Sequence, residues 1–326
     1  MNPFAYVRPA DSGAAMRAIA TVPSARYIAG GTNILDLMKD DVERPPLLVD
    51  INAIGLREIR ASDDAVELGA LARMADVARH PAVRDNFTAV AMALDETASP
   101  QLRNMGTIGG NVLQRTRCAY FRDPATPCNK RRPGSGCAAI GGVNRTHAIL
   151  GTSDRCIATH ASDLAVALIA FDATLHIVSV DAAREVPIRS FYRLPQDAPN
   201  VENVLAPGEL IASVELRHGA VPMRSTYLKV RDRAQYEFAL ASAAVALVVE
   251  SGIIRDARIA LGGVGTIPWL APEASAILVG SQPSRALFER AAAAAVAGAH
   301  GYGQNDFKIV LAQRTLVRAL ESVAGA

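Results

Sequence analysis

The sequence predicts an α+β protein in which two α/β units are followed by a unit of strands packed by helices. Three observations support this fold class. A strand–loop–helix–strand pattern occupies the first 55 residues, strands and helices alternate up to about residue 220, and beyond it long apolar strands precede the helices. With 326 residues, half of them apolar and a fifth charged, the chain is long enough for two or three domains with their own cores.

The first unit spans residues 1–55. Its first helix begins at Asp11 or Ser12, because either side chain can cap a helix, and ends near Thr21. The remaining expected elements are a strand over 25–29, the tight loop GGTN, a helix over 34–39 and a strand over 46–51. The glycine loop therefore lies at the carboxyl end of a strand.

The second unit spans residues 56–220. The expected elements are a strand over 65–71, helices over 74–80 and 83–97, a loop over 99–112, a helix over 163–171 capped by Ser162, a strand over 173–180, and two strands flanking the turn at 206–209. Between 118 and 156 no periodicity is visible. This stretch is rich in Pro, Gly and Arg and contains all four cysteines of the chain.

The third unit spans residues 221–326. Strands are expected over 225–233 and 238–265, the second with a turn at 251–252, and helices over 272–279, 284–299 and 306–323. The last helix is predicted by apolar residues that recur near helical spacing, namely Ile309, Val310, Leu316, Val317 and Leu320.

Composition excludes several kinds of partner. The net charge of +2 gives no general attraction to nucleic acid or to acidic membranes, and interleaved aromatic and basic residues are absent. The amino terminus lacks a basic region followed by an apolar run, and no apolar stretch reaches membrane-spanning length. We therefore expect neither nucleic acid nor membrane as partner, and no export signal in this chain.

Two Gly-Gly loops are candidate phosphate-binding segments. AGGTN (29–33) lies between a strand and a helix, and TIGGN (107–111) is a second loop of the same kind. Adjacent glycines allow a ligand to approach the backbone and expose N–H groups to an anion. Each loop alone is equally explained as a tight turn or helix cap, but two of them could hold the two phosphates of a pyrophosphate. Neither loop matches the P-loop or Rossmann pattern.

The sequence resembles the FAD-binding medium subunit of the xanthine dehydrogenase, or molybdenum hydroxylase, family. AGGTNIL (29–35) and TIGGN (107–111) match its two diphosphate-binding loops. The match continues through ASDLAVALIAFDATL (161–175), LAPGELIASVEL (205–216), YLKVRDR (227–233) and ARIALGGVGTIPW (257–269). The resemblance implies a PCMH-type FAD-binding domain formed by the first two units, and a carboxyl-terminal domain of the CO dehydrogenase flavoprotein type.

The resemblance also implies which residues contact the cofactor. They are Tyr27, Ile28, Ala29, Gly30, Gly31, Thr32, Asn33, Ile34, Leu35, Thr107, Gly109, Gly110, Asn111, Asp163, Leu210 and Lys229. Asp163 is expected to face the flavin or its ribityl chain, with Leu210 and Lys229 nearby. A cation such as Lys229 would stabilise negative charge on a flavin, although a solvated lysine on a strand explains the same residue without a cofactor. No catalytic residue is expected beyond the flavin.

The cysteine-rich segment, at about 115–157, is an insertion relative to the common form of the subunit. A similar insertion occurs in 4-hydroxybenzoyl-CoA reductase and in certain bacterial aldehyde oxidoreductases, where it carries a [4Fe–4S] cluster. The resemblance therefore implies that Cys118, Cys128, Cys137 and Cys156 are the cluster ligands. Some relatives with the insertion are exported with a signal-bearing partner, so we expect a cytoplasmic or periplasmic location.

The spacing of the cysteines leaves other chemistry open. Nine, eight and eighteen residues separate them, which is too wide for a ferredoxin pattern and lacks the paired knuckles of a zinc site. Zinc remains an alternative because His147 and His160 lie close by. Four cysteines could also form two disulfides, but a chain of this length has little need of them.

The expected function follows from the resemblance. The chain would be an FAD- and [4Fe–4S]-containing electron-transfer subunit that delivers electrons to an external acceptor. Its partners would be a large subunit with the molybdenum cofactor, which oxidises aldehydes to carboxylates, and a small subunit with [2Fe–2S] clusters. The alternatives are a flavoprotein subunit of the 4-hydroxybenzoyl-CoA reductase type and a non-catalytic scaffold that binds zinc.

Overall fold

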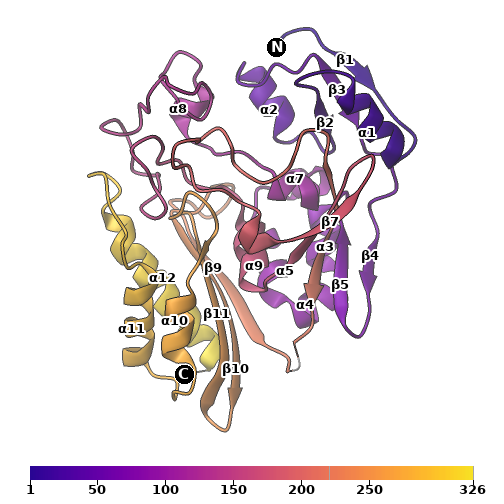
Figure 1. The fold of residues 1–326 in the computed structure, drawn as a ribbon. Coiled ribbons are helices and arrows are strands. Elements are labelled where there is room, and N and C mark those ends of the chain that lie inside the picture. The colour runs from indigo at the N-terminus through magenta and orange to yellow at the C-terminus, as the bar shows by residue number, and fades with distance from the viewer. Residues whose placement is uncertain (220, 326) are drawn as a thin grey trace.

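The computed structural model describes residues 1–219 and 221–325, which form three sheets with helices packed around them (Figure 1). The first sheet is parallel, with strand order β1-β3-β2. Its elements are β1 (Ala5–Val7), α1 (Ser12–Ala20), β2 (Arg26–Ile28), α2 (Ile34–Lys39) and β3 (Leu47–Asp50). The Asp11 carboxylate accepts the N–H of Ala14 and so caps α1, as its sequence position predicts.

The second sheet is antiparallel, with strand order β4-β5-β8-β6-β7. Its strands are β4 (Ile59–Ala61), β5 (Ala65–Gly69), β6 (Thr174–Val178), β7 (Ala183–Pro187) and β8 (Leu210–Arg217), with a 3-10 turn at Ile188–Ser190. The helices of this unit are α3 (Met74–Arg79), α4 (Pro81–Asn86), α5 (Thr88–Asp95), α6 (Pro100–Met105), α7 (Ile108–Val112) and α9 (Asp163–Ala170). Alternate residues of β5 and β6, including Val66, Leu68 and Leu175, pack into a shared core with α5 and α9.

The third sheet is antiparallel, with strand order β12-β11-β10-β9. Its elements are β9 (Arg224–Val230), β10 (Ala241–Glu250), β11 (Ile253–Gly262), β12 (Trp269–Leu270), α10 (Pro272–Leu278), α11 (Arg285–Ala295) and α12 (Phe307–Ala324). Figure 1 shows α10–α12 along one face of these strands and α5 and α9 along the other. Val245 and Leu247 face the first helical layer, whereas Ala244 and Ala246 face the second, which is why β10 is apolar at nearly every position.

The cysteine-rich segment contains one short helix, α8 (Ala119–Arg122), and otherwise irregular chain. It is held by an isolated bridge between Cys128 and Cys137, and three of its cysteines belong to a buried hydrophobic cluster that includes Leu37 of α2. The segment is therefore fixed against the first unit even though it has no sheet of its own.

Several predicted elements are wrong in detail. The helix expected over 83–97 is broken at Phe87, where the backbone leaves the helical region, and so forms α4 and α5. The loop expected over 99–112 contains α6 and α7, capped by Ser99 and Thr107. Only one strand, β8, flanks the turn at 206–209, because the preceding chain makes a single bridge between Tyr192 and Asn203. The short strands β1, β4 and β12 were not predicted.

Within residues 1–219 and 221–325, no helix combines the length and apolar character needed to cross a bilayer.

Candidate functional site

A cavity of about 930 Å³ lies where the three units meet. Its wall is formed by the loop after β2, the start of α7, the start of α9 and the end of β9. Ligand pockets in proteins usually enclose about 300–1,000 Å³. The cavity is therefore large enough for a cofactor rather than for an ion or a single small metabolite.

The loop 29–33 offers backbone donors to this cavity. Gly31 has φ +74°, a conformation that favours glycine, and Gly30 passes so close to α6 that a Cβ on it would lie 1.9 Å from the Met105 carbonyl oxygen. In the described part of the chain, the N–H groups of residues 31–34 have no acceptor. Unpaired N–H groups that line a cavity are suited to bind an anion.

The loop 107–111 approaches the same cavity from the second unit. The Thr107 hydroxyl accepts the N–H of Gly110 at 3.3 Å and caps α7. Gly109 packs tightly, because a Cβ on it would lie 3.0 Å from the Cβ of Ala70. A Cβ on Gly110 would meet only the Thr107 hydroxyl, so the cavity side of this glycine is open.

The structure brings almost all the predicted cofactor residues to this one cavity. Those lining it are Tyr27, Ala29, Gly30, Gly31, Thr32, Asn33, Ile34, Leu35, Thr107, Gly109, Gly110, Asn111, Asp163, Leu210 and Lys229. Ile28 is not among its lining residues; it lies in β2, where its carbonyl accepts the N–H of Ile51. The two glycine loops, 78 positions apart in sequence from Gly31 to Gly109, thus line a common space.

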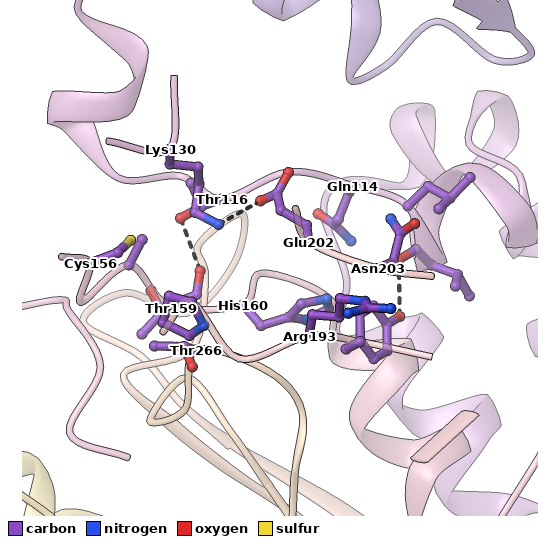
Figure 2. A pocket seen from close by; sticks show the side chains of 15 residues that line it. Gln114, Thr116, Lys130, Cys156, Thr159, His160, Arg193, Glu202, Asn203 and Thr266 are labelled. Atoms are coloured by element: carbon purple, nitrogen blue, oxygen red, sulfur yellow. Dashed lines mark hydrogen bonds and ion pairs between the residues drawn. The ribbon is translucent and has the colours of Figure 1, made fainter. Parts of the chain in front are cut away.

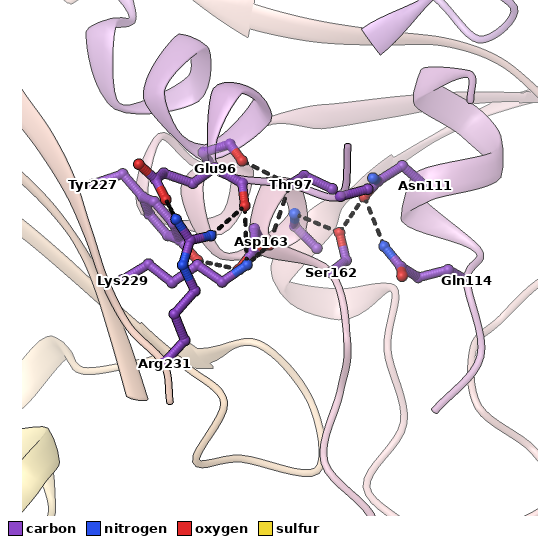
Figure 3. A network of polar contacts seen from close by, with 12 residues as sticks. Glu96, Thr97, Asn111, Gln114, Ser162, Asp163, Tyr227, Lys229 and Arg231 are labelled. Atoms are coloured by element: carbon purple, nitrogen blue, oxygen red, sulfur yellow. Dashed lines mark hydrogen bonds and ion pairs between the residues drawn. The ribbon is translucent and has the colours of Figure 1, made fainter. Parts of the chain in front are cut away.

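Asp163 and Lys229 form a buried ion pair at the edge of the cavity (Figure 3). The Lys229 ammonium lies 2.8 Å from the Asp163 carboxylate, and their side chains are only 1% and 5% exposed. Asp163 also accepts hydrogen bonds from the Tyr227 hydroxyl at 2.6 Å and the Thr97 hydroxyl at 3.2 Å. Burial, together with the Asp163 charge, raises the pKa of Tyr227 well above its ordinary value. Lys229 is therefore not a solvated strand lysine.

Sequence reasoning missed the loop between β9 and β10. Its residues Arg233, Tyr236, Glu237 and Phe238 line the cavity, although Phe238 was expected to begin a strand. Tyr236 has φ +58°, which is uncommon for a bulky residue. The Arg117 guanidinium lies 5.0 Å from the centre of the Phe238 ring, so the cysteine-rich segment contacts this loop.

The four cysteines gather around a second, much smaller cavity of about 10 Å³. All four are free thiols, and Cys118, Cys128 and Cys156 are buried. Burial, together with the other cysteines nearby, raises the pKa of Cys118 to about 12 and also raises that of Cys156. A Lys130 charge acts in the opposite direction on Cys156.

The residues that line this small cavity have the right chemistry for an iron–sulfur cluster, although the cavity is small. Four thiols converge from distant positions, which is the ligand set that a [4Fe–4S] cluster needs. However, in the residues that the structure describes, no three His, Cys, Asp or Glu side chains are already arranged to hold a metal ion.

A third cavity has a volume of about 40 Å³, and Figure 2 shows the side chains that line it. It shares Leu113 and Gln114 with the large cavity, and Lys130 and Cys156 with the cysteine cavity. The third cavity therefore borders both the large cavity and the cysteine cavity.

Buried ion pairs connect the walls of these cavities. The Lys130 ammonium is 2.9 Å from the Glu202 carboxylate, which is in turn 2.6 Å from the Arg115 guanidinium. Arg115 also pairs with Glu43 at 2.5 Å. These cations hold the pKa of Glu202 below its ordinary value in spite of its burial. The network fixes the cysteine-rich segment against the wall of the large cavity.

Two family models match the chain. The FAD-binding domain of molybdopterin dehydrogenases matches residues 2–217, and the CO dehydrogenase flavoprotein C-terminal domain matches residues 226–323. These matches confirm the resemblance and the fold class expected from the sequence.

Individual relatives give the same result. The aldehyde oxidoreductase FAD-binding subunit PaoB of Escherichia coli strain K12 is 44% identical over 324 residues, which is 98% of each chain. The carbon monoxide dehydrogenase medium chain of Afipia carboxidovorans is 26% identical and covers 98% of this chain and 96% of its own. A solved carbon monoxide dehydrogenase from Hydrogenophaga pseudoflava, lacking the Mo-pyranopterin moiety of its cofactor, matches with a TM-score of 0.78 at 25% identity, over 100% of this chain and 99% of that one. With two glycine loops lining one cofactor-sized cavity and family models matching both parts of the chain, this protein belongs to the FAD-binding subunits of the molybdenum hydroxylase family.

Proposed function

We propose that this chain is the FAD- and [4Fe–4S]-containing electron-transfer subunit of a molybdenum hydroxylase complex that oxidises aldehydes to carboxylates. The observation that carries the proposal is the arrangement of the cavities. Four free thiols surround one cavity, and a third cavity shares lining residues both with this one and with the large cavity. When bound, the two cofactors supply the redox chemistry, and the protein supplies their binding and orientation.

In this proposal, the large cavity holds FAD. The unpaired N–H groups of residues 31–34 would bind the diphosphate, and the open side of Gly110 would leave room for it. The Asp163–Lys229 pair lies at the cavity edge and fixes the amino-terminal end of α9 against β9. Because Asp163 offsets the Lys229 charge, the pair acts on the flavin as a dipole rather than as an isolated cation.

Cys118, Cys128, Cys137 and Cys156 are the proposed cluster ligands. Lys130, whose side chain is 11% exposed, lines the cysteine cavity and places a positive charge near thiolates that would otherwise be costly to bury. Arg131 donates to the carbonyl groups of Tyr120 and Phe121, so it holds the irregular chain around the ligands. We also propose domain boundaries near residues 55 and 220.

The proposed partners are a molybdenum-cofactor large subunit and a small subunit with [2Fe–2S] clusters. Oxidation of an aldehyde with water to a carboxylic acid releases two electrons and two protons at the large subunit. The electrons would then pass through this chain to an external acceptor. The aldehyde substrate class is supported by the name of the 44% identical relative, an aldehyde oxidoreductase subunit.

Co-purification followed by anaerobic addition of aldehyde tests the proposal. The complex should contain FAD and iron in this chain, and both chromophores should bleach when an aromatic or aliphatic aldehyde is added. The isolated chain should not oxidise aldehydes. A complex that aldehyde does not bleach, but that is bleached by a reductant and regains its colour when an aromatic acyl-CoA is added, would favour the 4-hydroxybenzoyl-CoA reductase type. A colourless chain with stoichiometric zinc would overturn the proposal.

A further inference from the structure

We propose that His147 is a positioning residue that donates a hydrogen bond from Nε2 to the Cys118 sulfur and thereby raises the reduction potential of the iron–sulfur cluster. The inference rests on the proposed function, because it requires the cluster. The Nε2 and Sγ atoms are 3.2 Å apart, and the two residues are 4% and 9% exposed. Water therefore has little access to this contact.

The hydrogen-bonding capacity of the imidazole indicates which nitrogen carries the proton. In the described part of the chain, Nδ1 of His147 is buried and has no partner. A proton on Nδ1 would leave a buried donor unpaired, whereas a proton on Nε2 points at the thiolate and leaves only a lone pair unpaired. The second arrangement costs less free energy.

The third unit holds the backbone of His147 in place. Lys308, which is fully buried, donates to the His147 carbonyl at 2.9 Å. Asn305, also fully buried, donates to the same carbonyl at 3.3 Å and to that of Ala148 at 3.1 Å. The N–H of His147 is taken by the Asn144 carbonyl at 2.9 Å. Both backbone groups of His147 are therefore bonded, which fixes the main chain from which its side chain reaches Cys118.

A donor at this place changes the electronic properties of a cluster. Hydrogen bonds to the ligand sulfurs of iron–sulfur clusters are among the features that set their reduction potential. Adding one electron makes the cluster more negative, so a donor to Cys118 stabilises the reduced form more than the oxidised one. His147 should therefore favour acceptance of the electron, and its removal should move the potential in the negative direction.

Three variants of the assembled complex test this inference by a redox titration monitored by electron paramagnetic resonance. His147→Leu removes the donor, and the potential should shift negatively by about 59 mV, which is a tenfold change for a one-electron couple. His147→Gln keeps an N–H group near the Nε2 position and should recover much of the shift. His160→Leu is the matched control. His160 lies just beyond the cysteine-rich segment, its Nδ1 accepts the N–H of Ser162, and its variant should leave the potential unchanged.

The outcomes separate this inference from the proposed function. A wild-type chain without iron contradicts the proposed function itself. An intact cluster with the same potential in His147→Leu as in wild type overturns the inference alone. If His147→Leu fails to hold a cluster, its potential cannot be measured. The potential of the Gln variant, and pulsed electron paramagnetic resonance of wild type labelled with ¹⁵N-histidine, then test whether His147 donates a hydrogen bond to Cys118. Weak nitrogen coupling supports a hydrogen bond, whereas strong coupling means that His147 ligates iron and overturns it.

Discussion

At the scale of single residues, glycines and a buried ion pair shape the wall of the large cavity. The sequence predicted Asp163 and Lys229 as cofactor residues, and both line the cavity. It did not predict that they pair with each other, because 66 positions separate them and pairing depends on how α9 meets β9. The glycines of both predicted loops line the cavity, but the sequence did not predict how they pack. Gly30 faces the backbone at Met105, whereas Gly110 faces open space.

Lys229→Met should destabilise the chain by about 3–5 kcal/mol, because it leaves the Asp163 carboxylate buried without its counter-ion. Asp163→Asn combined with Lys229→Met should cost less than the sum of the two single changes. Chemical unfolding of the purified chain measures both effects. Arg285→Ala, which breaks the pairs of an exposed arginine with Glu289 and Glu321, is the control and should cost at most about 1 kcal/mol. If Lys229→Met and Arg285→Ala lowered the free energy of unfolding equally, Asp163 and Lys229 would not form a buried ion pair.

Gly110→Val should weaken FAD binding at least about tenfold, or about 1.4 kcal/mol, because the side chain would occupy the open side of the loop. Flavin content after purification, and titration of the flavin-free chain with FAD, measure the effect. Gly13→Val places the same residue in α1, outside the large cavity, and should leave FAD binding intact. Full flavin content in Gly110→Val would show that the loop 107–111 does not hold the diphosphate.

Cys128→Ser should lower the iron content while FAD remains bound, because the cysteine cavity and the large cavity are distinct. Gly110→Val serves as the reciprocal control, since it should lose FAD and keep iron. Iron and flavin assays on both variants check this. Unchanged iron in Cys128→Ser would mean that this thiol is not a ligand.

At the scale of elements, regular stretches with a clear apolar pattern were predicted well and short ones were not. The bounds of α2 and the turn between β10 and β11 agree with the sequence reasoning. α6 and α7 were missed because they are five or six residues long and α7 contains two glycines, which have low helix propensity. Their caps, Ser99 and Thr107, were the available signal. The break at Phe87 was missed because an apolar run continues across it.

Lys308, at the beginning of α12, should make the free energy of unfolding depend on pH. Burial and the Arg145 charge lower the pKa of Lys308 to about 7, so between about 7 and the ordinary value of 10.5 only the unfolded chain holds this proton. Stability should rise with pH across that window by up to about 1.4 kcal/mol per pH unit, and be flat below it. Urea unfolding at a series of pH values should show that Lys308→Met lacks this rise. The same slope in both proteins would contradict the assignment.

At the scale of the whole molecule, the candidate site exists only because three units meet. Each unit supplies a wall of the large cavity, and the third unit also holds the chain around His147. The sequence predicted the residues of two walls because they form motifs. It could not predict the β9–β10 loop or the Lys130–Glu202–Arg115 network, because these depend on contacts between segments that carry no local pattern.

The measurement that tests the central claim most directly is the visible absorption spectrum of the purified chain, recorded before and after addition of dithionite. We predict flavin bands superimposed on a broad iron–sulfur absorption, both of which bleach on reduction, with one FAD and four irons per chain by assay. Flavin bands without the broad absorption would contradict the cluster, and a colourless chain that contains zinc would contradict both cofactor assignments.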